Sequence, residues 1–144
     1  MAKVSVIIVN YNGESFLGEL FESLARQVRS PDEVIMVDNA STDKSVSYVR
    51  QHFPWVKVVA SPINSGFAGG SNIGVANAEG EYIALLNSDT VADERWLSEL
   101  VEALEENENI AGADSKIYRA GEYPVIEEAG AGFNNLGYLW AFHC

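Results

Sequence analysis

Three apolar segments of this chain each end at a short polar cluster, and this pattern constrains the fold more than any other feature. The strands and the clusters that follow them are 4–9 with 10–13, 33–37 with 38–41, and 81–86 with 87–90. Such apolar, β-branched runs are typical of strands buried on both faces of a parallel sheet. Because ligands of open α/β sheets bind at the carboxyl ends of the strands, the pattern predicts one polar crevice shared by three strands.

Segments with the apolar spacing of amphipathic helices lie between the predicted strands. We expect Ser41 to cap the second helix and the glycine-rich segment 64–70 to remain a loop. In chain order we expect strands over 4–9, 33–37, 56–59, 81–86 and 110–117, and helices over 16–24, 46–53, 71–78 and 96–104. This alternation predicts an α/β fold with a mostly parallel sheet, helices on both faces and right-handed crossovers.

Charge and composition exclude several classes of protein. The formal net charge is −12, so we expect no nucleic-acid partner, because phosphate binding requires clustered basic residues. No apolar run approaches the about 20 residues that span a bilayer. The single cysteine is the last residue, Cys144, which fits a reducing compartment, and we expect a cytoplasmic protein.

The periodic pattern ends near residue 120. We expect residues 1–120 to form the ligand-binding part of a domain and residues 121–144 to begin a further region that is truncated at the carboxyl end. Exposed apolar surface drives association, so this end predicts self-association. The apolar and aromatic residues concerned are Phe133, Leu136, Tyr138, Leu139 and Trp140.

The turn after the first strand excludes two common nucleotide-binding motifs. Its sequence, Asn-Tyr-Asn-Gly at 10–13, contains neither the Gly-x-Gly-x-x-Gly of dinucleotide folds nor the Gly-Lys-Ser/Thr of a P-loop. The glycines of 66–70 have the wrong spacing for either motif. We therefore expect neither a standard NAD site nor a standard ATP site.

Four motifs, in this order along the chain, resemble those of the family 2 glycosyltransferases, which have the GT-A fold, a Rossmann-like mostly parallel sheet flanked by helices. The motifs are Val-Ser-Val-Ile-Ile-Val-Asn-Tyr-Asn-Gly at 4–13, Val-Asp-Asn-Ala-Ser-Thr-Asp at 37–43, Asn-Ser-Gly-Phe-Ala-Gly-Gly-Ser-Asn-Ile-Gly at 64–74 and Leu-Leu-Asn-Ser-Asp-Thr at 85–90. The third motif is similar to that of the rhamnosyltransferase branch. The resemblance extends from about Val4 to Ile117 and implies a nucleotide-sugar-binding part over 1–120 and the start of an acceptor-side region over 121–144.

The resemblance implies a site for a nucleoside diphosphate sugar, with UDP or dTDP as the favoured nucleotide. It implies that Tyr11 stacks on the base, that Asp38 binds the ribose or fixes the turn, and that Asn39 pairs with the base edge in place of an acid. The full set of implied contacts is Asn10, Tyr11, Asn12, Asp38, Asn39, Gly66, Asn72, Asn87 and Ser88. A purely structural role is the alternative for each motif: a packed tyrosine, turn chemistry, or a plain loop.

The segment 87–89 occupies the place of the family's Asp-x-Asp motif, with Asn87 at the first position. The resemblance implies that Asp89 coordinates a Mn²⁺ or Mg²⁺ ion bound to the diphosphate. Such a hard cation takes few protein ligands and keeps phosphate and water as the others. A helix cap or structural acid is the alternative role for Asp89.

The resemblance implies inverting, metal-dependent transfer of a sugar to a sugar or lipid-linked acceptor, such as a cell-surface polysaccharide, with the full-length protein peripheral at the inner membrane face. A general base deprotonates the acceptor in such a reaction. In this family the base comes from a later segment, so we expect it beyond residue 144 and expect residues 1–144 alone to be inactive.

Two other functions stay open. One is a non-catalytic module that binds nucleotide sugars, for which Asn87 in place of an acid is the relevant feature. The other is a sugar-1-phosphate nucleotidyltransferase, although the Arg- or Lys-bearing glycine-rich loop after the first strand is missing here.

Overall fold

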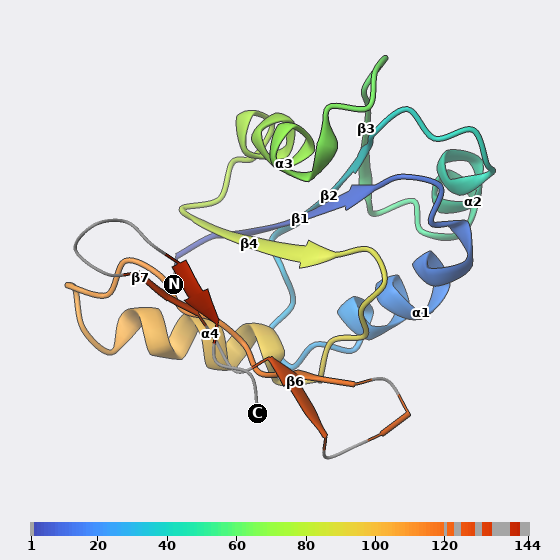
Figure 1. Ribbon diagram of the computed structural model, residues 1–144. Coiled ribbons are helices and arrows are strands. Elements are labelled where there is room, and N and C mark those ends of the chain that lie inside the picture. The colour runs from blue at the N-terminus through green and yellow to red at the C-terminus, as the bar shows by residue number, and fades with distance from the viewer. Residues whose placement is uncertain (1, 120, 123–124, 129–130, 134–138, 142–144) are drawn as a thin grey trace. The chain divides into compact units, whose positions relative to one another are not determined.

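A computed structural model describes residues 2–119, 121–122, 125–128, 131–133 and 139–141 of the chain (Figure 1). The chain divides into two compact units, Met1–Leu97 and Ser98–Cys144. The first unit contains the sheet and three helices, and the predicted site residues all belong to it.

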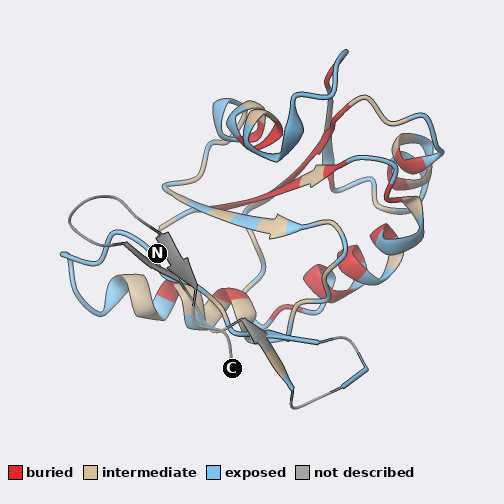
Figure 2. Cartoon of the chain, in the orientation of Figure 1, coloured by how far each residue is buried: buried red, intermediate tan, exposed pale blue. Residues whose placement is uncertain are grey.

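The first unit is built on a four-stranded parallel sheet with the strand order β3-β2-β1-β4. The strands are β1 (Val4–Asn10), β2 (Glu33–Asp38), β3 (Lys57–Ala60) and β4 (Tyr82–Asn87). Each lies within one or two residues of a predicted strand, so the parallel α/β class is confirmed for these elements. The apolar residues of β1 and β2 are almost all buried, whereas residues of β4 alternate between exposed and half-buried (Figure 2).

Three helices flank this sheet: α1 (Glu14–Ala25), α2 (Ser45–His52) and α3 (Gly66–Ala76). Helix α3 covers one face of β1 and β2, and α1 and α2 lie on the other side of the sheet (Figure 1). The apolar stripe of α1 is fully buried through Leu17, Leu20, Phe21 and Leu24. The two-sided cover explains why β1 is apolar at nearly every position.

Two predictions about the helix starts are wrong. Helix α3 begins at Gly66 and includes most of the glycine-rich segment that was expected to be a loop. Glycine is tolerated there because α3 packs very close to β1: a Cβ on Gly70 would lie 2.6 Å from Cγ1 of Val9. Ser41 does not cap α2. Instead Asp43 accepts hydrogen bonds from the backbone N–H and the hydroxyl of Ser45, where α2 begins.

The second unit contains most of α4 (Trp96–Glu105), which begins in the first unit, and two short antiparallel pairs of strands. The pairs are β5 (Ile117–Tyr118) with β6 (Ile126–Glu128), and β7 (Ala131–Phe133) with β8 (Leu139–Ala141). The predicted fifth strand over 110–117 is therefore wrong, since only its last residue is in a strand and that strand is antiparallel. The small residues at 111–113 are exposed and offer no apolar face to bury.

The side chains expected to mediate self-association, Phe133, Leu136, Tyr138, Leu139 and Trp140, lie outside the described side chains. Over the residues that the structure describes, none of the helices has both the length and the apolar character needed to cross a membrane.

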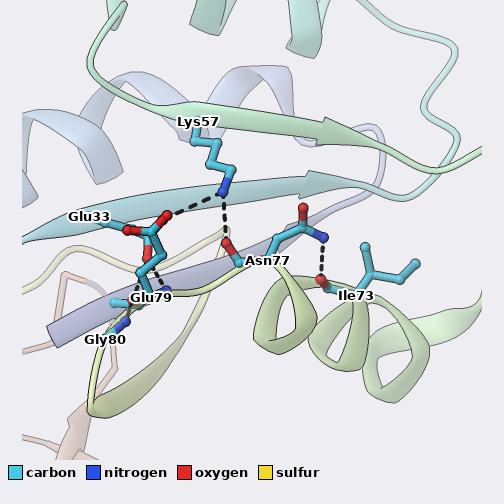
Figure 3. A network of polar contacts seen from close by, with 7 residues as sticks. Glu33, Lys57, Ile73, Asn77, Glu79 and Gly80 are labelled. Atoms are coloured by element: carbon cyan, nitrogen blue, oxygen red, sulfur yellow. Dashed lines mark hydrogen bonds and ion pairs between the residues drawn. The ribbon is translucent and has the colours of Figure 1, made fainter.

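A polar network ties the amino ends of the strands together, at the edge of the sheet opposite the predicted site (Figure 3). Glu33 on β2 accepts hydrogen bonds from the Ser5 hydroxyl at 2.6 Å and the Glu79 backbone N–H at 2.7 Å. Lys57 on β3 lies 3.7 Å from the same carboxylate and donates to the carbonyl oxygen of Asn77 at 2.7 Å. Burial raises the pKa of Glu33, but these hydrogen bonds and the Lys57 charge outweigh it and lower the pKa below 4.5.

Candidate functional site

The parallel register brings the predicted polar clusters to one edge of the sheet. Asn10 at the end of β1 is level with Asp38 at the end of β2, and Val9 is level with Asn87 at the end of β4. The crevice predicted from the strand endings therefore has its residues at the same carboxyl edge.

Asn10 and Asp38 form a buried frame beneath this edge. Asn10 is 0% exposed, and its Nδ2 donates to Oδ1 of Asp38 at 3.2 Å and to the hydroxyl of Ser41 at 3.1 Å. The other carboxylate oxygen of Asp38 accepts from the backbone N–H of Ser41 at 3.1 Å. Both side chains thus join the ends of two strands and fix the turn that follows β2, which is the turn-forming role considered for Asp38.

The Oδ1 atom of Asn10 is the one buried side-chain polar atom without a hydrogen-bond partner among the described residues. It lies under Gly13, where an added Cβ would come within 2.5 Å of it and within 3.6 Å of the Ser88 hydroxyl. A side chain at position 13 would therefore force Asn10 to shift, and the first and fourth motifs lie close together at this point.

Asn12 connects the loop after β1 to the loop after β2. It has a positive φ of 52°, and its Oδ1 accepts from the backbone N–H of Thr42 at 2.8 Å. Its own backbone N–H donates to the hydroxyl of Ser41 at 2.9 Å. Asn12 is exposed, but its side-chain oxygen already accepts a hydrogen bond from the second motif.

Glu14 and Asp43 cap each other's helices, which the sequence did not reveal. The Asp43 carboxylate accepts from the backbone N–H of Glu14 at 3.1 Å, at the start of α1. The Glu14 carboxylate accepts from the backbone N–H of Lys44 at 3.0 Å, just before α2. Burial raises the pKa of Asp43, but its hydrogen bonds with Ser45 and Glu14 outweigh this and lower the pKa below 3.8. The only sequence signal was an acid at each helix start.

Asn39 links the second motif to the third. Its Nδ2 donates to Oδ1 of Asn64 at 2.8 Å and to the carbonyl oxygen of Gly66 at 3.1 Å. Its Oδ1 accepts from the backbone N–H and the hydroxyl of Ser65 at 3.0 and 3.2 Å. Asn64 and Ser65 were not singled out as site residues, because their importance depends on the contact with β2.

Several predicted residues are open to solvent above this frame. Tyr11 is 54% exposed, and Phe67 in the first turn of α3, which the sequence analysis did not select, is 53% exposed. Asn72, Asn87 and Asp89 are also exposed, and Ser88 is half-buried. An exposed aromatic ring beside polar side chains suits a ligand that has both a flat ring and oxygen atoms.

Asp89 lies on the turn after β4, where the hydroxyl of Thr90 donates to the carbonyl oxygen of Asn87 at 2.7 Å. Within the described residues no group of three or more His, Cys, Asp or Glu side chains is arranged to hold a metal ion. A single exposed carboxylate beside an amide supplies hard oxygen donors. This donor set fits a divalent cation that takes most of its ligands from phosphate and water.

An open hollow of about 620 Å³ lies beside this edge, next to α1 and the start of α2. Its lining includes the carboxylates of Glu14, Glu19, Glu22 and Asp43. This acidic lining disfavours an anionic ligand in the hollow.

Comparisons with known proteins place the chain in a family. The family model described as glycosyl transferase family 2 matches residues 5–136. An uncharacterised glycosyltransferase of Haemophilus influenzae is 30% identical over 115 residues, which cover 78% of this chain and 36% of that protein. The chain thus spans about a third of the length of this relative.

Several solved structures are similar to the chain, and two of them were determined with a nucleotide sugar bound. The crystal structure of Staphylococcus aureus TarS residues 1–349 in complex with UDP-GlcNAc has a TM-score of 0.67 and 28% identity, over 81% of this chain and 38% of that one. The mannosyltransferase PcManGT from Pyrobaculum calidifontis, in complex with GDP-Man and Mn²⁺, has a TM-score of 0.69 and 26% identity, over 82% of this chain and 36% of that one. These similarities confirm the expected GT-A class of fold.

Proposed function

Since the chain belongs to glycosyl transferase family 2, we propose that the whole protein transfers a sugar from a nucleoside diphosphate sugar to an acceptor hydroxyl, with inversion at the sugar carbon. The observation that carries this proposal is the common carboxyl edge of β1, β2 and β4, where a buried polar frame supports exposed Tyr11 and Asp89. Two relatives with solved structures were captured with UDP-GlcNAc and with GDP-Man.

The exposed residues have separate roles in this proposal. Tyr11 stacks on the base of the donor nucleotide, for which we favour UDP or dTDP. Asp89, with Asn87 beside it, holds Mn²⁺ or Mg²⁺ against the diphosphate, and the cation supplies charge neutralisation as the diphosphate departs. Gly66 and Asn72 place the amino end of α3 next to the donor, where backbone N–H groups favour an anion.

The acceptor half of the reaction belongs to the rest of the protein in this proposal. Residues 1–120 bind the donor and residues 121–144 begin the acceptor side, while the general base lies beyond residue 144. We propose a polysaccharide or lipid-linked acceptor, with the protein cytoplasmic and peripheral at the inner membrane face. The apolar residues between Phe133 and Trp140 favour self-association of residues 1–144 alone.

A non-catalytic nucleotide-sugar-binding module is the second candidate function. The feature that favours it is Asn87, which leaves Asp89 as the one carboxylate on the β4 turn. Both candidates require nucleotide binding, so only turnover by the full-length protein separates them. Turnover by residues 1–144 alone would contradict our placement of the general base.

Binding calorimetry tests the donor site directly. The chain is titrated with UDP, dTDP and GDP, each with and without Mn²⁺. We expect metal-dependent binding of one nucleotide, and Asp89→Ala should weaken it at least about tenfold, because a charge-assisted metal contact is lost. Asp114→Ala is the matched control, because it removes an exposed carboxylate whose one hydrogen bond among the described residues is with its neighbour Ser115. Equal binding by wild type and Asp89→Ala would refute the metal role of Asp89.

A further inference from the structure

The Asn39 side chain has no polar atom left over for a ligand. A carboxamide offers two N–H donors and one oxygen with two lone pairs. Both donors are used by Asn64 and Gly66, and the oxygen accepts twice from Ser65. The residue is also only 2% exposed. A direct contact with the base edge would break one of these buried hydrogen bonds.

The contacts of Asn39 organise a turn at the amino end of α3. Oδ1 of Asn64 accepts from Asn39 and also from the backbone N–H of Gly66 at 2.9 Å. Gly66 has a positive φ of 71°, a conformation that glycine adopts without strain. Asn39 on one side and the segment 64–66 on the other thus form a closed set of hydrogen bonds, which we call the Asn39 clamp.

The clamp also fixes the orientation of the Asn64 amide. Two donors hold its oxygen, so the amide cannot rotate without losing both bonds. Asn64 is exposed, and no hydrogen bond of its Nδ2 occurs within the part of the chain that the structure describes. Its N–H groups therefore remain to donate to an acceptor oxygen.

We propose that Asn39 is a positioning residue of the donor site, which fixes the 64–66 turn so that the Asn64 amide donates to an oxygen of the bound nucleotide. Asn39 itself does not pair with the base. This inference rests on the proposed function only in assuming that a nucleotide binds at this edge. The clamp itself can be tested without any ligand.

Amide hydrogen exchange of the chain tests the clamp. The backbone N–H groups of Ser65 and Gly66 donate within it, so Asn39→Ala should speed their exchange by about tenfold, with little change elsewhere. Asn77→Ala is the matched control, because that amide donates to Ile73 at the far end of α3. Unchanged exchange at Ser65 and Gly66 in Asn39→Ala would overturn the proposal.

A double-mutant cycle on nucleotide affinity tests the positioning role. With UDP, dTDP and GDP in the presence of Mn²⁺, Asn39→Ala and Asn64→Ala should each weaken the best-bound nucleotide about tenfold. If Asn39 acts only through the turn, the double variant should bind no more weakly than Asn64→Ala. Additive losses would show that Asn39 contacts the ligand independently and would overturn the inference.

The two proposals fail in different ways in this experiment. Absence of nucleotide binding by the wild-type chain would contradict the proposed function and, with it, the donor-site role of Asn39. Wild-type binding together with additive losses would contradict the inference alone. The control substitution Asn77→Ala should leave nucleotide affinity unchanged, both in the wild-type chain and in the Asn39→Ala variant.

Discussion

Replacing Gly70 with alanine tests the close packing of α3 against the sheet, because two effects of opposite sign compete. Alanine is favoured over glycine in a helix interior by about 0.8–1.0 kcal/mol, so helix propensity alone predicts a more stable protein. In the fold, however, the new Cβ would lie 2.6 Å from Cγ1 and 3.0 Å from Cγ2 of Val9. Carbon atoms rest at about 3.5–4.0 Å, so α3 or Val9 must move by about 1 Å.

The steric effect should outweigh the propensity effect. Overpacking of this kind costs about 1–3 kcal/mol, and Gly70 is buried over a strand that the rest of the sheet holds in place. Because the required shift is large, we take the upper end of that range and expect a net destabilisation of about 2 kcal/mol. Urea unfolding of wild type and Gly70→Ala measures this as a lower midpoint with the same slope.

Two further variants check the reasoning. Ala68→Gly, at an exposed position of the same helix, measures the propensity difference without the steric contact. In the Val9→Ala background both Cγ atoms are gone and only Cβ remains, at 3.4 Å, so Gly70→Ala should become neutral or stabilising. A Gly70→Ala protein as stable as wild type would refute the close approach of α3 to β1.

The remaining predictions concern the pH dependence of stability and the space under Gly13. Glu33 and Asp43 have pKa values lowered in the fold, so each stabilises the protein above its unfolded value of 4.5 or 3.8 and loses this contribution as pH falls through the folded value. We therefore expect the thermal unfolding temperature to drop below about pH 4.5. A Glu33→Gln protein should be less stable than wild type at pH 7, and this difference in stability should disappear in acid. A difference that stays constant with pH would contradict the pKa shift. Gly13→Ala should destabilise by about 1–3 kcal/mol in urea unfolding, since its Cβ would meet buried Asn10 Oδ1 at 2.5 Å, and an unchanged midpoint would show that the frame can relax.

The polar residues at the carboxyl edge form two layers, a buried layer with a structural role and an exposed layer that is open to a ligand. The buried layer contains Asn10, Asp38 and Asn39, whose hydrogen bonds join strands and loops. The exposed layer contains Tyr11 and Asp89, which remain available to a ligand. Substitutions in the first layer should affect stability and loop order, and affinity only through the loops, whereas those in the second should affect affinity alone.

The sequence by itself determined the four strands of the first unit, their parallel direction and the edge at which polar residues collect. These features follow from local patterns: an apolar run long enough to be buried on two faces, and a polar cluster directly after it. The start of α3 was not determined locally, because glycines usually break a helix and only the close approach to Val9 and Ile7 favours them at 70 and 74. The predicted strand over 110–117 failed for a related reason, since β propensity needs a face to pack against.

Only the tertiary structure decided which site residues have a structural role and which can contact a ligand. In sequence, Asn10, Asn12 and Asn39 are equivalent polar residues after strands, and each was a candidate ligand contact. In the fold, each of them hydrogen-bonds a residue about 25 to 30 positions away: Asn10 donates to Asp38, Asn12 accepts from Thr42, and Asn39 donates to Asn64. An amide has the same few donors and acceptors wherever it lies, and the long-range partners that use them depend on how the strands and loops meet in space.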